Sequence, residues 1–289
     1  MQTASGGVIG LIMAVLLAAL TSWCCYAQAE DNAMSDVEEL RAGKTFLPTR
    51  VYSAEEDQQV IKLFEELRVS DVVDGMDKVG LHNIGLMSSE IRAAWKDTER
   101  FTHRFVGIAL TVRYVPTNKA PAPEMDTAGF DRWAGEWYRE LSSEPFVPLI
   151  REGTALVFDD APDADVGSIG SNNIMAWRLR GCVGVVTNAT ARDTDEVAAE
   201  RIPLYFRKPG RGIRPGRNEI ESVNRPIVCG GVLVEPGDVI VADGDGVVVV
   251  PRARAEDVAE YARATLQRDK VGRRRLYKKL GLPLDDSVK

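Results

Sequence analysis

The chain has 289 residues and a formal net charge of −7. This length is enough for one large domain, or for a core domain with an added segment. The sequence has only two histidines, His82 and His103, and two of its four cysteines lie near the N-terminus. It therefore offers almost no ligands for a zinc site of the usual Cys/His kind.

The first 29 residues contain no charged side chain. Val8–Leu20 is an apolar run too short to span a bilayer comfortably, and residues 27–29, AQA, match the A-x-A pattern of signal-peptide cleavage sites. We therefore expect residues 1–29 to be a secretory signal peptide cleaved after Ala29, and the mature protein to be periplasmic or secreted. An uncleaved membrane anchor is the alternative. We expect no membrane span in the mature chain.

Two helices are predicted near the start of the mature chain. Residues 30–50 are polar and mixed, which favours a flexible lead-in. Ser53 followed by Glu56 forms a capping-box pattern ahead of an apolar face with helical spacing. Ser70 is expected to cap a second helix over residues 71–79.

Strands and one aromatic helix follow. Residues 105–115 alternate and are rich in β-branched side chains, which predicts a strand. Aromatic and aliphatic residues recur at helical spacing over residues 126–141, which predicts an amphipathic helix with an aromatic face. Such a face more often packs against protein than it binds a ligand. Further strands are predicted at 155–158 and 202–206, and a β-meander over 228–251.

The most informative stretch is residues 170–193, which combines a glycine-led turn, a short helix, a buried strand and an Arg-Asp pair. In α/β proteins, ligands collect at the carboxyl ends of strands, and Arg192 and Asp193 come just after such a strand. A guanidinium can grip a carboxylate with paired hydrogen bonds, and an aspartate offers oxygen ligands to a divalent cation. The pair therefore suits a keto acid held against a metal. A surface salt bridge is the commoner explanation of an isolated Arg-Asp pair.

Other motifs give weaker signals. Residues 243–246, DGDG, resemble part of a calcium loop, but Arg254 stands where such a loop needs a glutamate, so we interpret them as a turn. No G-x-G-x-x-G motif opens a helix after a strand, so a nucleotide cofactor has no support. Cys182 and Cys229 could form a disulfide in an oxidising compartment, although two separate buried thiols are the favoured interpretation.

The C-terminal region is strongly basic. The final amphipathic helix is predicted over residues 253–268, and residues 268–279, RDKVGRRRLYKK, hold seven basic residues against one acid. A solvated helix face is the plainer interpretation. Contact with RNA, lipid headgroups or an acidic protein surface is the alternative. We treat residues 271–289 as a basic tail and do not expect nucleic acid as a partner.

Taken together, these motifs resemble those of the RraA-like family, which includes 4-hydroxy-4-methyl-2-oxoglutarate aldolases. Residues 69–74, VSDVVD, are similar to that family's first helix motif, and residues 105–112, FVGIALTV, to its strand motif. Residues 170–193 and 230–251 resemble its two long glycine-containing motifs. In the family's order, these matches cover most of residues 55–270.

The resemblance implies a fold and an assembly. It implies a single α/β domain over residues 51–270, a layered α/β/β sandwich of the swivelling phosphohistidine-domain type. Residues 126–141 are an aromatic helical insertion in that domain. The resemblance further implies a homotrimer or a dimer of trimers, with its sites at subunit interfaces.

The resemblance also assigns roles to individual residues. It implies that Arg192 grips the carboxylate of a small 2-oxo acid, and that Asp193 holds Mg²⁺ or Mn²⁺ largely through water. The family has an aspartate after the turn glycine, where this chain has Ser171, whose hydroxyl can bind water but cannot act as a strong base. Asp269 is a counterpart of an acid that the family places near a neighbouring subunit's site. The resemblance implies that the backbone N–H groups of Gly170, Ser171, Asn172 and Asn173 face the substrate carboxylate.

Two functions follow from these residues. We expect a divalent-metal-dependent lyase that releases pyruvate, either as an aldolase acting on 4-hydroxy-2-oxo acids or as an oxaloacetate decarboxylase. The alternative is a non-catalytic regulatory protein, as in family members that inhibit the ribonuclease RNase E. Ser171 and the basic C-terminal run favour this alternative, whereas the export signal opposes it, because RNase E is cytoplasmic.

Overall fold

The computed structural model describes residues 46–161, 165–285 and 287–288, and the structural statements below concern these residues. The predicted signal peptide and most of the lead-in lie outside them. The chain divides into two units, Met1–Pro48 and Thr49–Lys289. In the first, only residues 46–48 are described, and they are exposed and without regular secondary structure. No helix in the described part has both the length and the apolar character needed to cross a bilayer.

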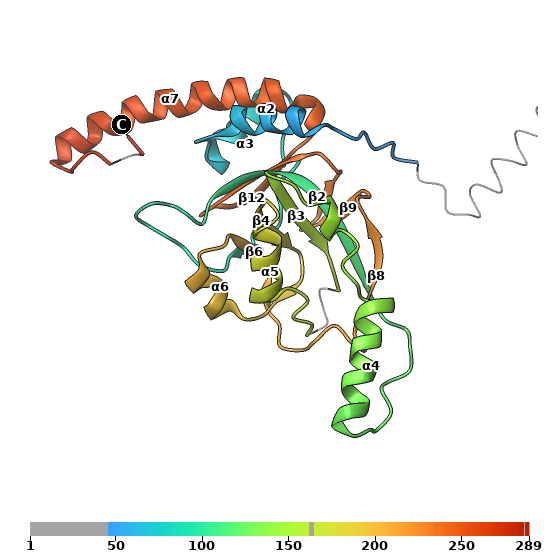
Figure 1. The fold of residues 1–289 in the computed structure, drawn as a ribbon. Helices are drawn as coiled ribbons and strands as arrows, with labels where there is room; N and C mark the ends of the chain where they lie inside the picture. Colours follow the sequence, from blue (N-terminus) through green and yellow to red (C-terminus); the bar gives the residue numbers. More distant parts are fainter. Residues whose placement is uncertain (1–45, 162–164, 286, 289) are drawn as a thin grey trace, which may run out of the picture. The chain divides into compact units, whose positions relative to one another are not determined.

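The second unit is a mixed α/β domain, as expected, and it is built around an eight-stranded sheet (Figure 1). The strand order is β1-β6-β4-β3-β2-β11-β12, and β8 also pairs with β2. β2, β3, β4 and β6 run parallel, and the other pairs are antiparallel. The edge strands β1 and β12 are in contact, so the sheet nearly closes on itself. The strands of the sheet are β1 (Arg92–Ala93), β2 (Phe105–Pro116), β3 (Thr154–Asp159), β4 (Cys182–Thr187), β6 (Leu204–Phe206), β8 (Asn218–Val223), β11 (Val239–Asp243) and β12 (Gly246–Val250).

Short elements complete the domain. Two small ladders pair β9 with β10 and β5 with β7. Residues 208–218 contain β7 and the first residue of β8, a strand that the sequence does not predict. The remaining strands and short helices are β5 (Thr190–Ala191), β7 (Lys208–Pro209), β9 (Ile227–Cys229), β10 (Val232–Val234), η1 (Val147–Leu149) and η2 (Arg252–Arg254).

The two faces of the sheet carry separate hydrophobic cores. In β11, Val239 and Val241 belong to the cluster packed under helices, whereas Ile240 belongs to a cluster on the other face. In β2, Ile108 and Ala109 divide between the same two clusters. This alternation is what a strand dictates, since successive side chains point to opposite faces. The apolar runs of β2, β11 and β12 are therefore buried on both sides.

Three helices cover one core. α2 (Ala54–Phe64), α3 (Val69–Lys78) and α7 (Ala255–Leu280) lie together over the sheet (Figure 1). The buried residues of α7 all lie within its first half, up to Leu266. Its second half extends past α3. α7 is longer than the predicted 253–268, because the basic segment is rich in good helix formers and Gly281, with φ of 68°, ends the helix.

The start of α3 differs from the prediction. The helix begins at Val69, not after Ser70, and Arg68 occupies the N-cap position. Asp71 accepts a hydrogen bond from the backbone N of Arg68 at 3.0 Å. The Asp243 carboxylate, at the end of β11, accepts from the backbone N of Val69 at 2.9 Å. A side chain far away in sequence therefore caps this helix, which local sequence cannot reveal.

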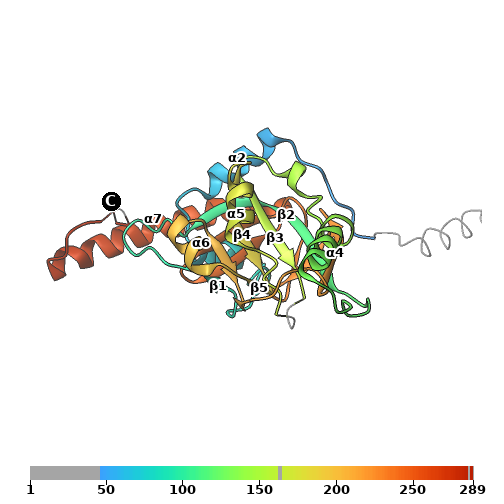
Figure 2. The same ribbon diagram turned by 60° about the horizontal axis from the view of Figure 1, so that its bottom comes forward.

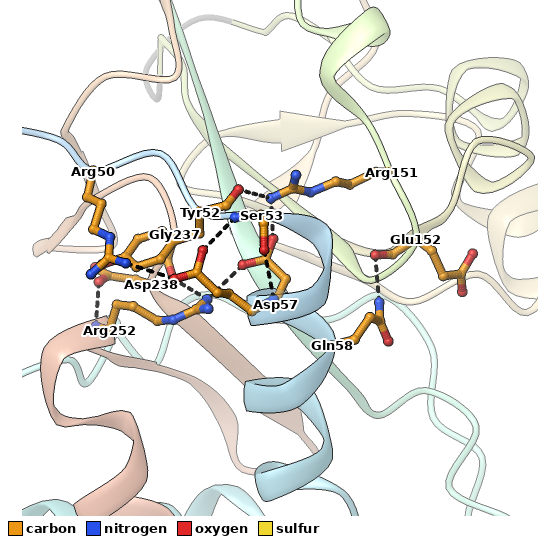
Figure 3. Close-up of polar contacts among 11 residues, drawn as sticks. Arg50, Tyr52, Ser53, Asp57, Gln58, Arg151, Glu152, Gly237, Asp238 and Arg252 are labelled. Atoms are coloured by element: carbon orange, nitrogen blue, oxygen red, sulfur yellow. Dashed lines mark hydrogen bonds and ion pairs between the residues drawn. The ribbon is translucent and has the colours of Figure 1, made fainter.

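A buried cluster of charges holds α2 against the domain (Figure 3). The helix starts with the predicted capping box between Ser53 and Glu56. Behind it, Asp57 is only 3% exposed. Its carboxylate accepts from the Arg151 guanidinium at 2.5 Å and from Arg252 Nη1 at 2.8 Å. Asp57 therefore joins α2 to the segments before β3 and after β12.

In Figure 1 the aromatic helix α4 (Thr127–Glu140) extends away from the sheet below β8, and in the turned view of Figure 2 it comes forward and overlaps the region of β2 and β3. Its capping residue is Asp126, which accepts from Gly129 N at 2.7 Å. Trp137 is 5% exposed and donates from Nε1 to the carbonyl of Asn218 at 3.0 Å. Phe130 is 41% exposed. The predicted packing face is therefore confirmed at Trp137, whereas Phe130 contacts Trp133 and otherwise remains partly exposed.

Both described cysteines are free. Cys182 opens β4 and Cys229 closes β9, and each is buried without a disulfide. Burial raises the pKa of the Cys182 thiol to about 11, and it raises the pKa of Cys229 further. The interpretation as two separate buried thiols is confirmed. Such thiols are unreactive packing residues.

Candidate active site

The chain after β5 returns to the start of α5 (Ser171–Arg178). Ile169 and Ala191 form an isolated parallel bridge, and Arg192 N donates to the carbonyl of Ile169 at 2.8 Å. The turn before α5 therefore lies beside the predicted Arg-Asp pair, although 20 or so residues separate them along the chain. α6 (Thr194–Glu200) begins directly after that pair.

Arg192, Asp193 and Ser171 lie together at the N-terminus of α5. Arg192 Nε and Asp193 Oδ1 are 3.8 Å apart, and the two side chains are 38% and 37% exposed. Asp193 Oδ2 accepts from the backbone N of Ser171 at 3.2 Å. The Nε atom of Arg192 is buried and has no hydrogen-bond partner in the described part of the chain. The structure thus brings the predicted site residues together and leaves them within reach of a small ligand.

Two glycines make room for this arrangement. A Cβ atom at position 170 would lie 2.7 Å from Asp193 Oδ2, and one at position 167 would lie 2.7 Å from Arg192 Cβ. At either position a side chain would force Arg192 or Asp193 to move, so Gly167 and Gly170 allow these two residues to lie against the turn. The sequence motif points to Gly170 but not to Gly167. The only sign of Gly167 in the sequence is that a second glycine lies three residues before Gly170.

The first turn of α5 provides positive potential toward the site. Its backbone N–H groups have no carbonyl partner within the helix, and one of them, that of Ser171, already faces Asp193. Asn172 is exposed. The side chain of Asn173 points elsewhere, since its Nδ2 donates to Glu144 Oε1 at 2.6 Å. Asn172 and Asn173 are both predicted to face the substrate. Because the side-chain amide N–H group of Asn173 is bound to Glu144, this residue can offer a ligand only its backbone N–H as a donor.

Glu144 holds α5 in place through hydrogen bonds to two of its side chains. Besides the bond from Asn173, its carboxylate accepts from Trp177 Nε1 at 3.1 Å and from Arg214 Nη2 at 2.6 Å. Arg214 is 7% exposed and also donates to the Tyr114 hydroxyl at 2.9 Å. Sequence reasoning misses this cluster, because Glu144 and Arg214 lie in loops 70 residues apart and no motif marks either.

The acidic loop after β3 is not a solvated turn throughout. Asp160 is 3% exposed and accepts from Asn218 Nδ2 at 2.9 Å. Asp159 accepts from Asn188 Nδ2 at 2.8 Å, and burial raises the pKa of its carboxyl. These two acids are therefore bound to amide side chains and are not part of a solvated turn. Residues 162–164 of the loop lie outside the described residues.

The donor set determines which metal the site could hold. Within the described residues, no three His, Cys, Asp or Glu side chains gather in a way that could hold a metal ion. The candidate site contributes one carboxylate, that of Asp193, beside the buried Ser171. Mg²⁺ keeps several waters and needs only one or two protein carboxylates together with its substrate. The site therefore fits a hydrated cation of this kind and not a metal enclosed by side chains of the residues that the structure describes.

Solved structures share the fold. Streptomyces coelicolor RraAS2, described as an unusual member of the RNase ES inhibitor RraA protein family, superposes with a TM-score of 0.60 at 20% identity, over 76% of this chain and 98% of that one. An uncharacterized protein from Pseudomonas syringae pv. tomato gives a TM-score of 0.58 at 24% identity, over 84% of this chain and 100% of that one. At these identities the likeness concerns the fold alone.

Sequence comparison supplies the family. A putative 4-hydroxy-4-methyl-2-oxoglutarate aldolase of Halalkalibacterium halodurans is 33% identical over 112 residues, 38% of this chain and 52% of that protein. The chain spans about half the length of the curated relatives it matches. The sequence profile of the RraA-like family, described as Aldolase/RraA, matches residues 69–249. That range is well over half of the chain, which therefore belongs to the RraA-like family.

Proposed function

We propose that this protein is a divalent-metal-dependent carbon–carbon lyase that releases pyruvate from 4-hydroxy-2-oxo acids or from oxaloacetate. The observation that carries the proposal is the convergence of Arg192, Asp193 and Ser171 at the N-terminus of α5. The family includes proteins named 4-hydroxy-4-methyl-2-oxoglutarate aldolase, among them one from Thermus thermophilus that is 30% identical over 102 residues. It also includes proteins described as RNase inhibitors. Family membership alone therefore does not distinguish the two functions, and the proposal depends on the residues of the site.

Arg192 is the residue that binds the substrate carboxylate. Its guanidinium is a planar fork that matches a carboxylate with two parallel hydrogen bonds. The packing of its stem against Gly167 fixes the direction of the group, and its Nε has no acceptor within the described chain. The first-turn N–H groups of α5 add positive potential on the same side. A small 2-oxo acid would therefore be held by its carboxylate in one orientation.

Asp193 and Ser171 complete the site. Asp193 would hold Mg²⁺ or Mn²⁺ largely through water, and the cation supplies a Lewis acid that polarises the keto oxygen of the substrate. Arg192 fixes the carboxylate in the plane of the keto group, so that negative charge developing in the transition state meets a preorganised positive group. Retro-aldol cleavage and decarboxylation both produce the enolate of pyruvate, so the same residues serve both reactions.

Ser171 sets the limit on proton transfer. Its hydroxyl can position a water molecule by hydrogen bonding but cannot serve as a strong base at neutral pH. A second carboxylate, beside that of Asp193, would therefore have to come from elsewhere to take part in proton transfer. Asp269, on α7, is 46% exposed and 3.0 Å from Arg68 in its own chain. In the proposed homotrimer or dimer of trimers, Asp269 of a neighbouring subunit supplies that acid near the site.

We also propose bounds for the domain, for its flanking segments and for the export signal. Residues 51–270 form a domain of the swivelling phosphohistidine type, preceded by a lead-in over 30–50 and followed by a basic tail over 271–289. Residues 1–29 direct the protein to the periplasm or outside the cell. The apolar N-terminal run with its A-x-A pattern supports this, and detection of a mature protein starting at Glu30 in a periplasmic or culture fraction would test it.

Removal of the metal tests the activity. Purified protein treated with EDTA and dialysed is expected to release no pyruvate from 4-hydroxy-4-methyl-2-oxoglutarate or oxaloacetate above background, and Mg²⁺ or Mn²⁺ should restore release. Pyruvate is measured by coupling to lactate dehydrogenase. Because free metal ions accelerate oxaloacetate decarboxylation, the background is the Asp193→Asn variant with the same metal. Equal rates with and without EDTA would contradict the proposal.

The second candidate is a non-catalytic binding protein of the RNase E inhibitor type. Ser171 favours it, because a neutral side chain stands where the family's aldolases have an aspartate. In that case the protein releases no pyruvate with either metal but slows RNA cleavage by purified RNase E. Full-length protein found in the cytosol with its N-terminus intact would support this candidate over the lyase.

A further inference from the structure

A pocket lies under the half of α7 that extends past α3. The residues that line it take no part in the proposed lyase site. The volume of the pocket is about 710 Å³. One wall is the loop of residues 96–104, which we call the 96–104 loop, and the opposite walls are the start of α3, the β11–β12 turn and α7. The lining cations are Arg68, Arg100, Arg104, Lys270 and Arg273. We infer that this pocket binds a small oxyanion through Arg100 and Arg104.

Arg104 is held in place and lacks an acceptor. Its guanidinium carbon lies 4.0 Å from the centroid of the Phe101 ring. Its Nε is buried without a hydrogen-bond partner in the described chain, where only two other buried side-chain polar atoms share that state. One of those is Nε of Arg192 in the candidate active site. Arg104 lines the pocket, and an anion bound there is the ionic partner that its guanidinium lacks among the described residues.

The 96–104 loop is built to keep that arginine in position. Phe101 adopts φ of 57°, a left-handed backbone conformation that is costly for a bulky residue and that clusters at ligand sites. The Asp97 carboxylate stabilises the turn by accepting from Thr102 Oγ1 at 2.7 Å and from Arg100 N at 3.1 Å. Lys96 Nζ donates to the carbonyl of Gly244 at 2.8 Å and ties the loop to the opposite wall.

The other lining cations are already used. Arg68 is bound bidentately by Asp71, at 2.8 and 2.5 Å. Lys270 lies 3.5 Å from Glu66. Arg273 donates to the hydroxyl of Tyr277 on α7 and to the hydroxyl of Ser287 in the C-terminal segment.

The lining acids are also engaged, except at the exposed turn. Asp243 accepts from two backbone amides, those of Val69 and Asp245. Asp285 accepts from the Tyr277 hydroxyl at 3.1 Å. Asp245 itself is exposed. By contrast, the Arg100 and Arg104 guanidinium groups have neither a hydrogen bond nor an ion pair within the described residues, so no described carboxylate is paired with either of them.

This charge and size define the ligand class. A pocket of several hundred cubic ångströms suits a small molecule and not a macromolecular surface. Two guanidinium groups on one loop can donate hydrogen bonds to the oxygens of a phosphate or of a carboxylate, both of which match the forked geometry of the guanidinium. The hydroxyls of Ser70 and Thr98, which also line the pocket, suit either anion.

Calorimetric titration of the full protein tests the inference. In low-salt buffer containing EDTA, pyrophosphate and citrate are titrated separately, and one of them is expected to bind once per chain. Arg104→Gln and Arg100→Gln should each weaken that binding about tenfold or more, because each removes a charged hydrogen-bond donor. Arg100 is exposed, so its variant keeps the assay informative if Arg104→Gln fails to fold. The anion that binds more tightly identifies the source, phosphate or carboxylate.

Two further variants separate this pocket from other cations. Arg132→Gln, on the exposed surface of α4, is the matched control and should leave the dissociation constant unchanged. Arg192→Gln should also leave it unchanged, because the inference does not involve the lyase site. Binding lost in Arg192→Gln but kept in Arg104→Gln and Arg100→Gln would overturn the inference, as would no saturable binding of either anion. A failure of the lyase activity would leave this result untouched.

Discussion

Replacing Arg192 with alanine is expected to lower kcat/KM for pyruvate release about a hundredfold. The substitution removes the forked donor for the substrate carboxylate, and truncating one partner of a charged hydrogen-bonded pair costs about 2–5 kcal/mol. The side chain is 38% exposed, so we expect a loss of about 3 kcal/mol, near the lower end of that range. The coupled lactate dehydrogenase assay, run at saturating Mn²⁺, measures both kcat and KM.

Two matched variants make this result specific. Arg192→Lys keeps the charge but loses the planar fork, so its activity should fall between those of wild type and alanine. Arg180→Ala, at an exposed position just after α5, should have wild-type kinetics. Unchanged kinetics in Arg192→Ala, with the protein folded as judged by circular dichroism, would remove Arg192 from the mechanism.

Replacing Asp57 with alanine is expected to lower the free energy of unfolding by about 3 kcal/mol. Removing one member of a buried ion pair typically costs about 3–5 kcal/mol, because the opposite charge is left buried and unpaired. Arg252 has a side chain 8% exposed and would be left in that state, whereas Arg151, at 43%, can turn toward water. The lower end of the range is therefore appropriate. Urea unfolding followed by tryptophan fluorescence measures the change.

The control for this variant is Asp131→Ala, an exposed aspartate on α4. It should change the free energy of unfolding by no more than about 0.5 kcal/mol, as is usual for surface positions. A loss below about 1 kcal/mol in Asp57→Ala would show that the cluster in Figure 3 does not hold α2 to the domain. Lyase kinetics measured well below the unfolding midpoint should be unaffected, because Asp57 lies outside the candidate active site.

Periodicity in the sequence predicted the elements whose signals are local. The capping box at Ser53, the alternating run of β2 and the helical aromatic stripe of α4 all occur within a residue or so of the expected positions. Each depends on interactions between residues a few positions apart. β8 was missed because its partially exposed residues carry no strong alternation, and it is the pairing with β2 that makes it a strand.

The sequence predicted the candidate site at the level of the residue pair. Arg192 and Asp193 follow a buried strand, as expected, and Gly170 lies beside them. What supports them is long-range and therefore hidden: Glu144 and Arg214 meet α5 only after the chain has folded. The start of α3 was misplaced for the same reason, since a carboxylate from another strand caps it.

A crystal structure of the protein with Mn²⁺ and oxalate, a stable planar mimic of the pyruvate enolate, is the most direct test of the central claim. Anomalous scattering locates the metal independently of the protein coordinates. The account predicts one Mn²⁺ bound to Asp193, directly or through water, with an oxalate carboxylate paired to the Arg192 guanidinium. Mn²⁺ and oxalate bound elsewhere, with Arg192 and Asp193 contacting neither, would contradict it.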